Sequence, residues 1–134
     1  MTIKRLTKED RPFSMGVFKP IGHVVVALPD ETRALAAAQA LRDDGFAEVD
    51  ILQYNADEER VQMDSMLNHA SDFGGFGYEI QLMRKYQALA REGCSWLVVY
   101  TPDDGHAERV AVVAKRFDAK LAERYHRLVV EDLI

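Results

Sequence analysis

The chain has 134 residues, a length that fits one domain with a buried core. Hydrophobic residues make up 48% of it and charged residues 29%, a composition that argues against extensive disorder. The net charge of −5 argues against broad nucleic-acid binding, and no apolar run approaches the roughly 20 residues of a membrane span. We expect a cytoplasmic protein, because the polar first ten residues show no secretory signal and the single Cys94 allows no intrachain disulfide.

The first 21 residues contain proline and glycine but no sustained apolar period. We expect them to form an extended arm in front of one α+β domain over residues 22–134. This domain opens with residues 23–28, which are apolar at nearly every position and rich in valine. Such a run is typical of a strand that is buried on both faces.

A helix is predicted over residues 31–44. Asp30 can cap its N-terminus, because the carboxylate accepts the free amide hydrogens of the first turn. Gly45 can adopt the left-handed conformation that ends many helices. The buried face of this helix is predicted to contain Leu35, Ala38 and Leu41.

A second strand is predicted over residues 48–54, with Val49 and Ile51 on one face and acidic residues on the other. Residues 57–70 and 78–92 then carry apolar side chains at helical spacing, and a glycine-rich bend joins them. A strand–helix–strand unit is therefore followed by a helical pair.

The last third of the chain repeats the opening pattern. Residues 94–100 form a second apolar strand, and Asp103 or Asp104 can cap the helix that follows. A mixed strand is predicted over residues 125–130. The buried face of the helix is predicted to contain Val110, Val113, Ala114, Phe117 and Leu121.

Two strand–helix–strand units predict an α+β fold with a ferredoxin-like sheet and an inserted helical pair between strands two and three. The first and third strands would be central, because residues 23–28 and 94–100 are the most continuously apolar. A fully parallel, doubly wound sheet is the alternative. In the ferredoxin-like form, one sheet face is left for the inserted helical pair or for a second copy of the protein to cover.

The layout of the elements resembles that of bacterial general stress proteins of the heat-induced type. The similarity covers residues 22–134: a first strand, a helix ending in Gly45-Phe46, a second strand, a glycine-rich middle and a strand returning from Gly93 to Tyr100. It implies a small cytoplasmic protein, and a context rather than a mechanism, because the activity of that group is largely undefined. The Gly74–Gly77 bend departs from the group, since it is short and lies between charged amphipathic helices.

The glycine-rich bend offers the main candidate for a binding site. Its glycines precede a helix whose first amide hydrogens could hold a phosphate or a carboxylate. A phosphate loop would need a following Lys-Ser/Thr or a preceding strand, and the sequence has neither. A structural hinge is therefore the alternative interpretation. The candidate ligand-binding residues are His69, Asp72, Gly74, Gly75, Gly77 and Tyr78.

No other residue pattern identifies a reaction. The four histidines lack the spacing of a metal site. Cys94 follows the predicted end of a helix, where the helix dipole would oppose a thiolate. We therefore expect no metal, no cofactor and no catalytic residues.

Three functions remain open. The first is a non-enzymatic, stress-related or regulatory protein that acts through self-association, as a homodimer, or through a protein partner. The second is a small-molecule-binding sensor, with a ligand at the dimer seam or at the Gly74–Gly77 bend. The third is an enzyme that uses His69, Asp72 and Tyr78. The sequence favours the first, because it shows no catalytic constellation and predicts an exposed sheet face.

Overall fold

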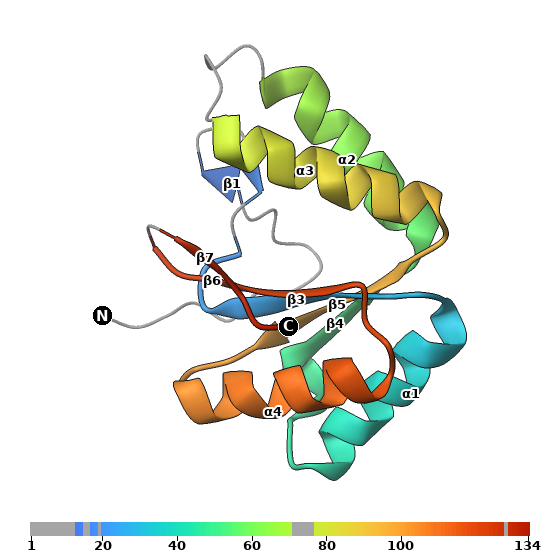
Figure 1. Cartoon of the computed structure of the whole chain (residues 1–134), viewed down its shortest axis with the longest axis vertical. Coiled ribbons are helices and arrows are strands. Elements are labelled where there is room, and N and C mark those ends of the chain that lie inside the picture. The colour runs from blue at the N-terminus through green and yellow to red at the C-terminus, as the bar shows by residue number, and fades with distance from the viewer. Residues whose placement is uncertain (1–12, 15–16, 19, 71–76, 128) are drawn as a thin grey trace.

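The structure is a computed structural model, and it describes residues 13–14, 17–18, 20–70, 77–127 and 129–134. Two short strands, β1 (Phe13–Ser14) and β2 (Val17–Phe18), pair antiparallel in the N-terminal arm. Strand β2 contacts both helices of the inserted pair, so this part of the arm folds back on the domain (Figure 1).

The main sheet has five described strands, and each neighbouring pair is antiparallel. The fully parallel alternative is therefore wrong. The two strands that were expected to be central, β3 and β5, both have a neighbour on each side. In spatial order the strands are β4 (Ile51–Tyr54), β5 (Ser95–Tyr100), β3 (His23–Leu28), β6 (Leu121–Tyr125) and β7 (Val130–Asp132).

One face of the sheet is covered by α1 (Glu31–Asp43) and α4 (Asp104–Arg116), as Figure 1 shows. Alternate residues of β3 point toward these helices and join an apolar core with small side chains of α1. We call this half of the molecule the α1–α4 layer. The buried residues that β3 and α1 contribute to this layer are Val24, Val26, Leu28, Ala34, Ala37, Ala38 and Leu41.

The other face is covered by α2 (Ala56–Ala70) and α3 (Gly77–Arg91), which pack against each other (Figure 1). We call this half the α2–α3 layer. Its core is built from larger side chains, among them Met63, Met83, Tyr86 and Trp96. Of the two candidates to cover this face, the inserted helical pair and a second copy of the protein, the structure shows the helical pair. The expectation of an exposed sheet face is therefore wrong.

The predicted N-caps of two helices and the predicted glycine after the first helix are confirmed. The Asp30 carboxylate accepts a hydrogen bond from the Arg33 amide at 2.8 Å, and the Asp103 carboxylate accepts one from the His106 amide at 2.9 Å. Gly45 has a φ of 100°, in the left-handed region that favours glycine after a helix. Within the described ranges, no helix is long and apolar enough to cross a membrane.

Two predictions near the first helix are wrong. Leu35 is 53% exposed, because it lies outside the stripe of α1 that faces the sheet. That stripe consists mainly of alanines, which allow the helix backbone to approach the strands closely. The second strand is shorter than predicted, since Glu48–Asp50 form a turn of 3₁₀ helix and leave Val49 exposed.

The C-terminal third also differs from its prediction. Helix α4 ends at Arg116, and Asp118 adopts a positive φ of 60°, which redirects the chain away from the helix axis. Leu121 therefore begins strand β6 and does not lie on the helix, although its spacing from Phe117 fits a helix. Strands β6 and β7 replace the single strand that was predicted over residues 125–130.

Candidate functional site

The residues predicted at the glycine-rich bend are only partly described. Asp72, Gly74 and Gly75 lie outside the described residues. His69 belongs to the last turn of α2, and Gly77 and Tyr78 belong to the first turn of α3. Their side chains lie outside the description, so the candidate site at the bend stays a prediction.

Strand β6 contributes polar side chains to both layers, because its successive residues point to opposite faces of the sheet. Glu123 and Tyr125 point toward α3, where they contact Lys85 and Tyr86. Arg124 points the other way, toward α4, and binds the Asp104 carboxylate at 2.6 Å. One strand thus connects two polar regions that lie on opposite sides of the sheet.

The first polar region is buried beneath α3. The hydroxyls of Tyr86 and Tyr125 form a hydrogen bond of 2.7 Å. Lys85 approaches the Glu123 carboxylate to 3.6 Å, and only 6% of the Glu123 side chain is exposed. Burial raises the pKa of both Tyr86 and Glu123, and Lys85 partly offsets the shift at Glu123.

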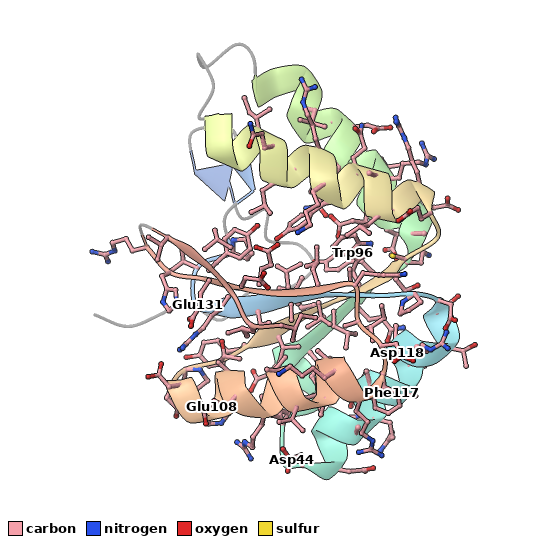
Figure 2. The ribbon with its side chains drawn as sticks, in the orientation of Figure 1. Asp44, Trp96, Glu108, Phe117, Asp118 and Glu131 are labelled. Carbon is pink, nitrogen blue, oxygen red and sulfur yellow. The ribbon has the colours of Figure 1, made fainter. Side chains whose placement is uncertain are left out.

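Glu59 is the least expected member of the α2–α3 layer. It is 2% exposed, and its Oε1 atom has no hydrogen-bond partner among the described residues. Burial, and secondarily the neighbouring Glu58, raise the pKa of Glu59 to about 7. The indole nitrogen of Trp96, which lies between the sheet and the helical pair (Figure 2), is also buried with no described partner. Tyr86 contacts the Trp96 ring, at a centroid distance of 5.2 Å.

This buried region can hold a proton near neutral pH, but it lacks the geometry of a catalytic site. A general acid or base must reach a substrate, and Glu59 and Glu123 are both enclosed. Among the residues that the structure describes, no cluster of three or more His, Cys, Asp or Glu side chains could hold a metal ion. Cys94 is buried as well, and burial raises the pKa of its thiol.

The second polar region is an open groove of about 740 Å³ between α4 and the β6–β7 hairpin. An ion pair and a hydrogen bond lie along it: Arg124 pairs with Asp104, and the Nε2 atom of His126 lies 2.9 Å from the Oε1 atom of Glu131. Figure 2 labels Glu131 on β7 and Glu108 on α4, the two elements that form its walls. The apolar part of the lining consists of Ala107, Ala111, Val112 and Leu133.

The groove exists because the sheet is wider than its helix layer. A helix with its side chains is about 10 Å wide and neighbouring strands lie about 4.8 Å apart, so one helix covers about two strands. Helix α4 packs against β3 and β6, and β7 lies one strand further out. The fifth strand therefore extends beyond the helices and leaves a concave surface beside α4.

The outer wall of the groove is a row of four side chains on α4, at spacings of three, one and three residues. We call this row the α4 strip: Glu108, Ala111, Val112 and Lys115. Val112, in the middle of the helix, is 66% exposed. Neither Glu108 nor Lys115 forms an ion pair with a described residue, so both charges are available to another molecule.

The sequence contains a signal for the α4 strip. Val112 lies outside the predicted buried face of its helix, and a charged residue stands near it on either side along the same face. The rest of the groove had no such signal, because the β6–β7 hairpin was not predicted. The burial of Glu59 was also missed, although Met63 lies four residues later on the same helix face.

Comparison with known protein families, with curated proteins and with solved structures finds no match to this chain. The function must therefore be argued from the residues of the groove and of the α4 strip.

Proposed function

We propose that this chain is a non-enzymatic, stress-related or regulatory protein that acts by association, as a homodimer or with a protein partner. The α4 strip is the proposed association surface. The observation that carries the proposal is the 66% exposure of Val112 between two charged side chains that have no described ion-pair partner.

The chemistry of the strip supports association. Ala111 and Val112 form an apolar centre, and burying them against another molecule would remove apolar surface from water. Glu108 and Lys115 lie at its ends, so the surface has an apolar centre and a charged rim. Protein interfaces commonly have this arrangement.

The fold that we propose is a ferredoxin-like core made of β3, β4, β5 and β6. Its support is the order β4-β5-β3-β6 with antiparallel neighbours, and the position of α1 and α4 on one face. In this interpretation β7 is an addition at the edge. The stress-related role and the cytoplasmic location rest on the resemblance in sequence layout and on composition.

A small-molecule-binding function is the second candidate, and the groove itself favours it. Arg124 is only 11% exposed, and its partner Asp104 is 93% exposed. A ligand carboxylate could replace such an exposed partner, because a guanidinium binds carboxylates with two parallel hydrogen bonds. Native mass spectrometry of the gently purified protein tests this function, which predicts a reproducible added mass that is lost in Arg124→Gln.

The association proposal is tested with a photoreactive amino acid at position 112, introduced in the living cell. We expect cross-linking of position 112 to a second copy of the chain or to another protein. Position 61 is the matched control, because Val61 is 58% exposed on α2 but lies on the opposite layer. Equal cross-linking at both positions, or none at position 112, would contradict the proposal.

A further inference from the structure

We propose that the molecule bound by the α4 strip is a second copy of this chain, and that the two α4 helices pack antiparallel about a twofold axis. This inference rests on the proposed function, and it adds the identity and the orientation of the partner. It is carried by the order of charges along the strip, which is complementary to itself when one helix is reversed.

The spacing of the strip fixes which residues would meet. In an antiparallel pair whose axis passes between positions 111 and 112, Val112 lies opposite the partner's Ala111. Glu108 then lies opposite the partner's Lys115, and symmetry forms the same ion pair at the other end. The two exposed valines are covered in the centre, and all four strip charges find opposite charges.

The opposite orientation does not give this result. In a parallel pair, each glutamate would face the partner's glutamate and each lysine the partner's lysine. The antiparallel arrangement also aligns the two helix dipoles favourably. The small Ala111 allows the backbones to approach closely at the centre, as helix packing at 8–10 Å requires.

Exposure alone does not create a self-complementary surface, as Val61 on α2 shows. Val61 is 58% exposed, but its neighbours on the same helix include Asp57, Glu58 and Asp64. In an antiparallel pair of α2 helices, Asp57 and Glu58 would gain no basic partner comparable to Lys115, because the residues three and four positions after Val61 are an aspartate and a serine. The charge pattern therefore selects α4 from the helices with an exposed valine.

The test uses charge reversal in the full-length chain and sedimentation equilibrium. The unmodified protein should form a dimer. Glu108→Lys and Lys115→Glu should each weaken it on the order of tenfold, because each change replaces two attractive pairs with two repulsive ones. Arg84→Glu, which changes the charge by the same amount as Lys115→Glu but at an exposed position of α3, is the matched control and should leave the dimer unchanged.

Mixing and combining the variants tests the pairing itself. A mixture of the Glu108→Lys and Lys115→Glu chains should form heterodimers, since all four charges are again paired. The chain that carries both changes should recover its homodimer. Because both positions are exposed, the variants should keep the circular dichroism and melting temperature of the parent protein.

Three outcomes would overturn the inference: a monomeric parent protein, a dimer that ignores both single changes, or two weakened variants that do not pair when mixed. These results can be separated from a failure of the proposed function. Cross-linking of position 112 to a different protein would leave the proposed function standing, while a monomeric parent protein would remove only the second copy as its partner.

Discussion

The two layers of this molecule share one sheet but have different interiors. In the α1–α4 layer, the buried apolar cluster consists mostly of alanine, valine and leucine, and Ser95 is a buried hydroxyl on the same face of β5 as Leu97. In the α2–α3 layer, the sheet meets methionines, aromatic rings and the carboxyl groups of Glu59 and Glu123. Alternate residues of the same strands supply both interiors. The α1–α4 layer packs small aliphatic side chains against the sheet, whereas burial raises the pKa of two carboxyl groups in the α2–α3 layer, so we expect the stability of that layer to depend on pH.

The largest effect should come from a cavity in the apolar layer. Leu28 is fully buried, so Leu28→Ala should lower the free energy of unfolding by about 2–5 kcal/mol. Because the substitution removes an uncharged side chain from an apolar cluster, the loss should be the same at pH 5 and pH 8. Urea denaturation at both pH values measures it. Leu35→Ala is the control, since Leu35 is 53% exposed, and a comparable loss there would contradict the assignment of the buried face.

The next effect concerns the protonation of Glu59. Its folded pKa of about 7 lies above the ordinary value of 4.5, so folding favours the protonated form. The contribution of Glu59 to the free energy of unfolding is fully present below about pH 4.5. It is lost as the pH rises to about 7, by roughly 3 kcal/mol in total. Glu59→Gln should therefore be more stable than the parent protein at pH 8 and nearly equal to it at pH 4.5.

Urea denaturation of both proteins across pH 4.5–8 measures how the free energy of unfolding varies with pH. Glu58→Gln is the matched control, because Glu58 is exposed on the same turn and should leave most of the pH dependence in place. A parent protein whose stability rises between pH 5 and pH 7, with Glu59→Gln following the same curve, would show that Glu59 is not buried as described.

The smallest effect concerns the hydroxyl pair in the same layer. Tyr125→Phe removes the 2.7 Å hydrogen bond to Tyr86 and should cost about 1 kcal/mol. Tyr86→Phe removes the same bond from the other side. A double-mutant cycle should therefore give a coupling energy of about 1 kcal/mol, and additive losses would contradict the bond.

Much of the fold could be predicted, because it follows from local chemistry. The apolar runs of β3 and β5 identified the strands with a neighbour on each side, and the caps at Asp30 and Asp103 marked the starts of two helices. Strand β6 could not be predicted in the same way. Its Glu123-Arg124 pair is polar, and it becomes a strand through the contacts that its two faces make with different layers.

The proposed functional surfaces were harder to predict than the fold. The groove is assembled from α4 and the β6–β7 hairpin, and the turn between α4 and β6 contains Asp118 with a positive φ, a conformation that non-glycine residues seldom adopt. The burial of Glu59 runs against the usual preference of carboxylates for water. Only the α4 strip left a signal in the sequence, as a valine outside the predicted buried face with Glu108 and Lys115 near it.

The association surface is the central claim, and sedimentation equilibrium of three proteins tests it most directly. The parent protein and Val61→Glu should both be dimers, because Val61 lies outside the α4 strip. Val112→Glu should be a monomer at the same concentration, because it places two buried carboxylates at the centre of the interface. A Val112→Glu protein that dimerises as well as the other two would contradict the account.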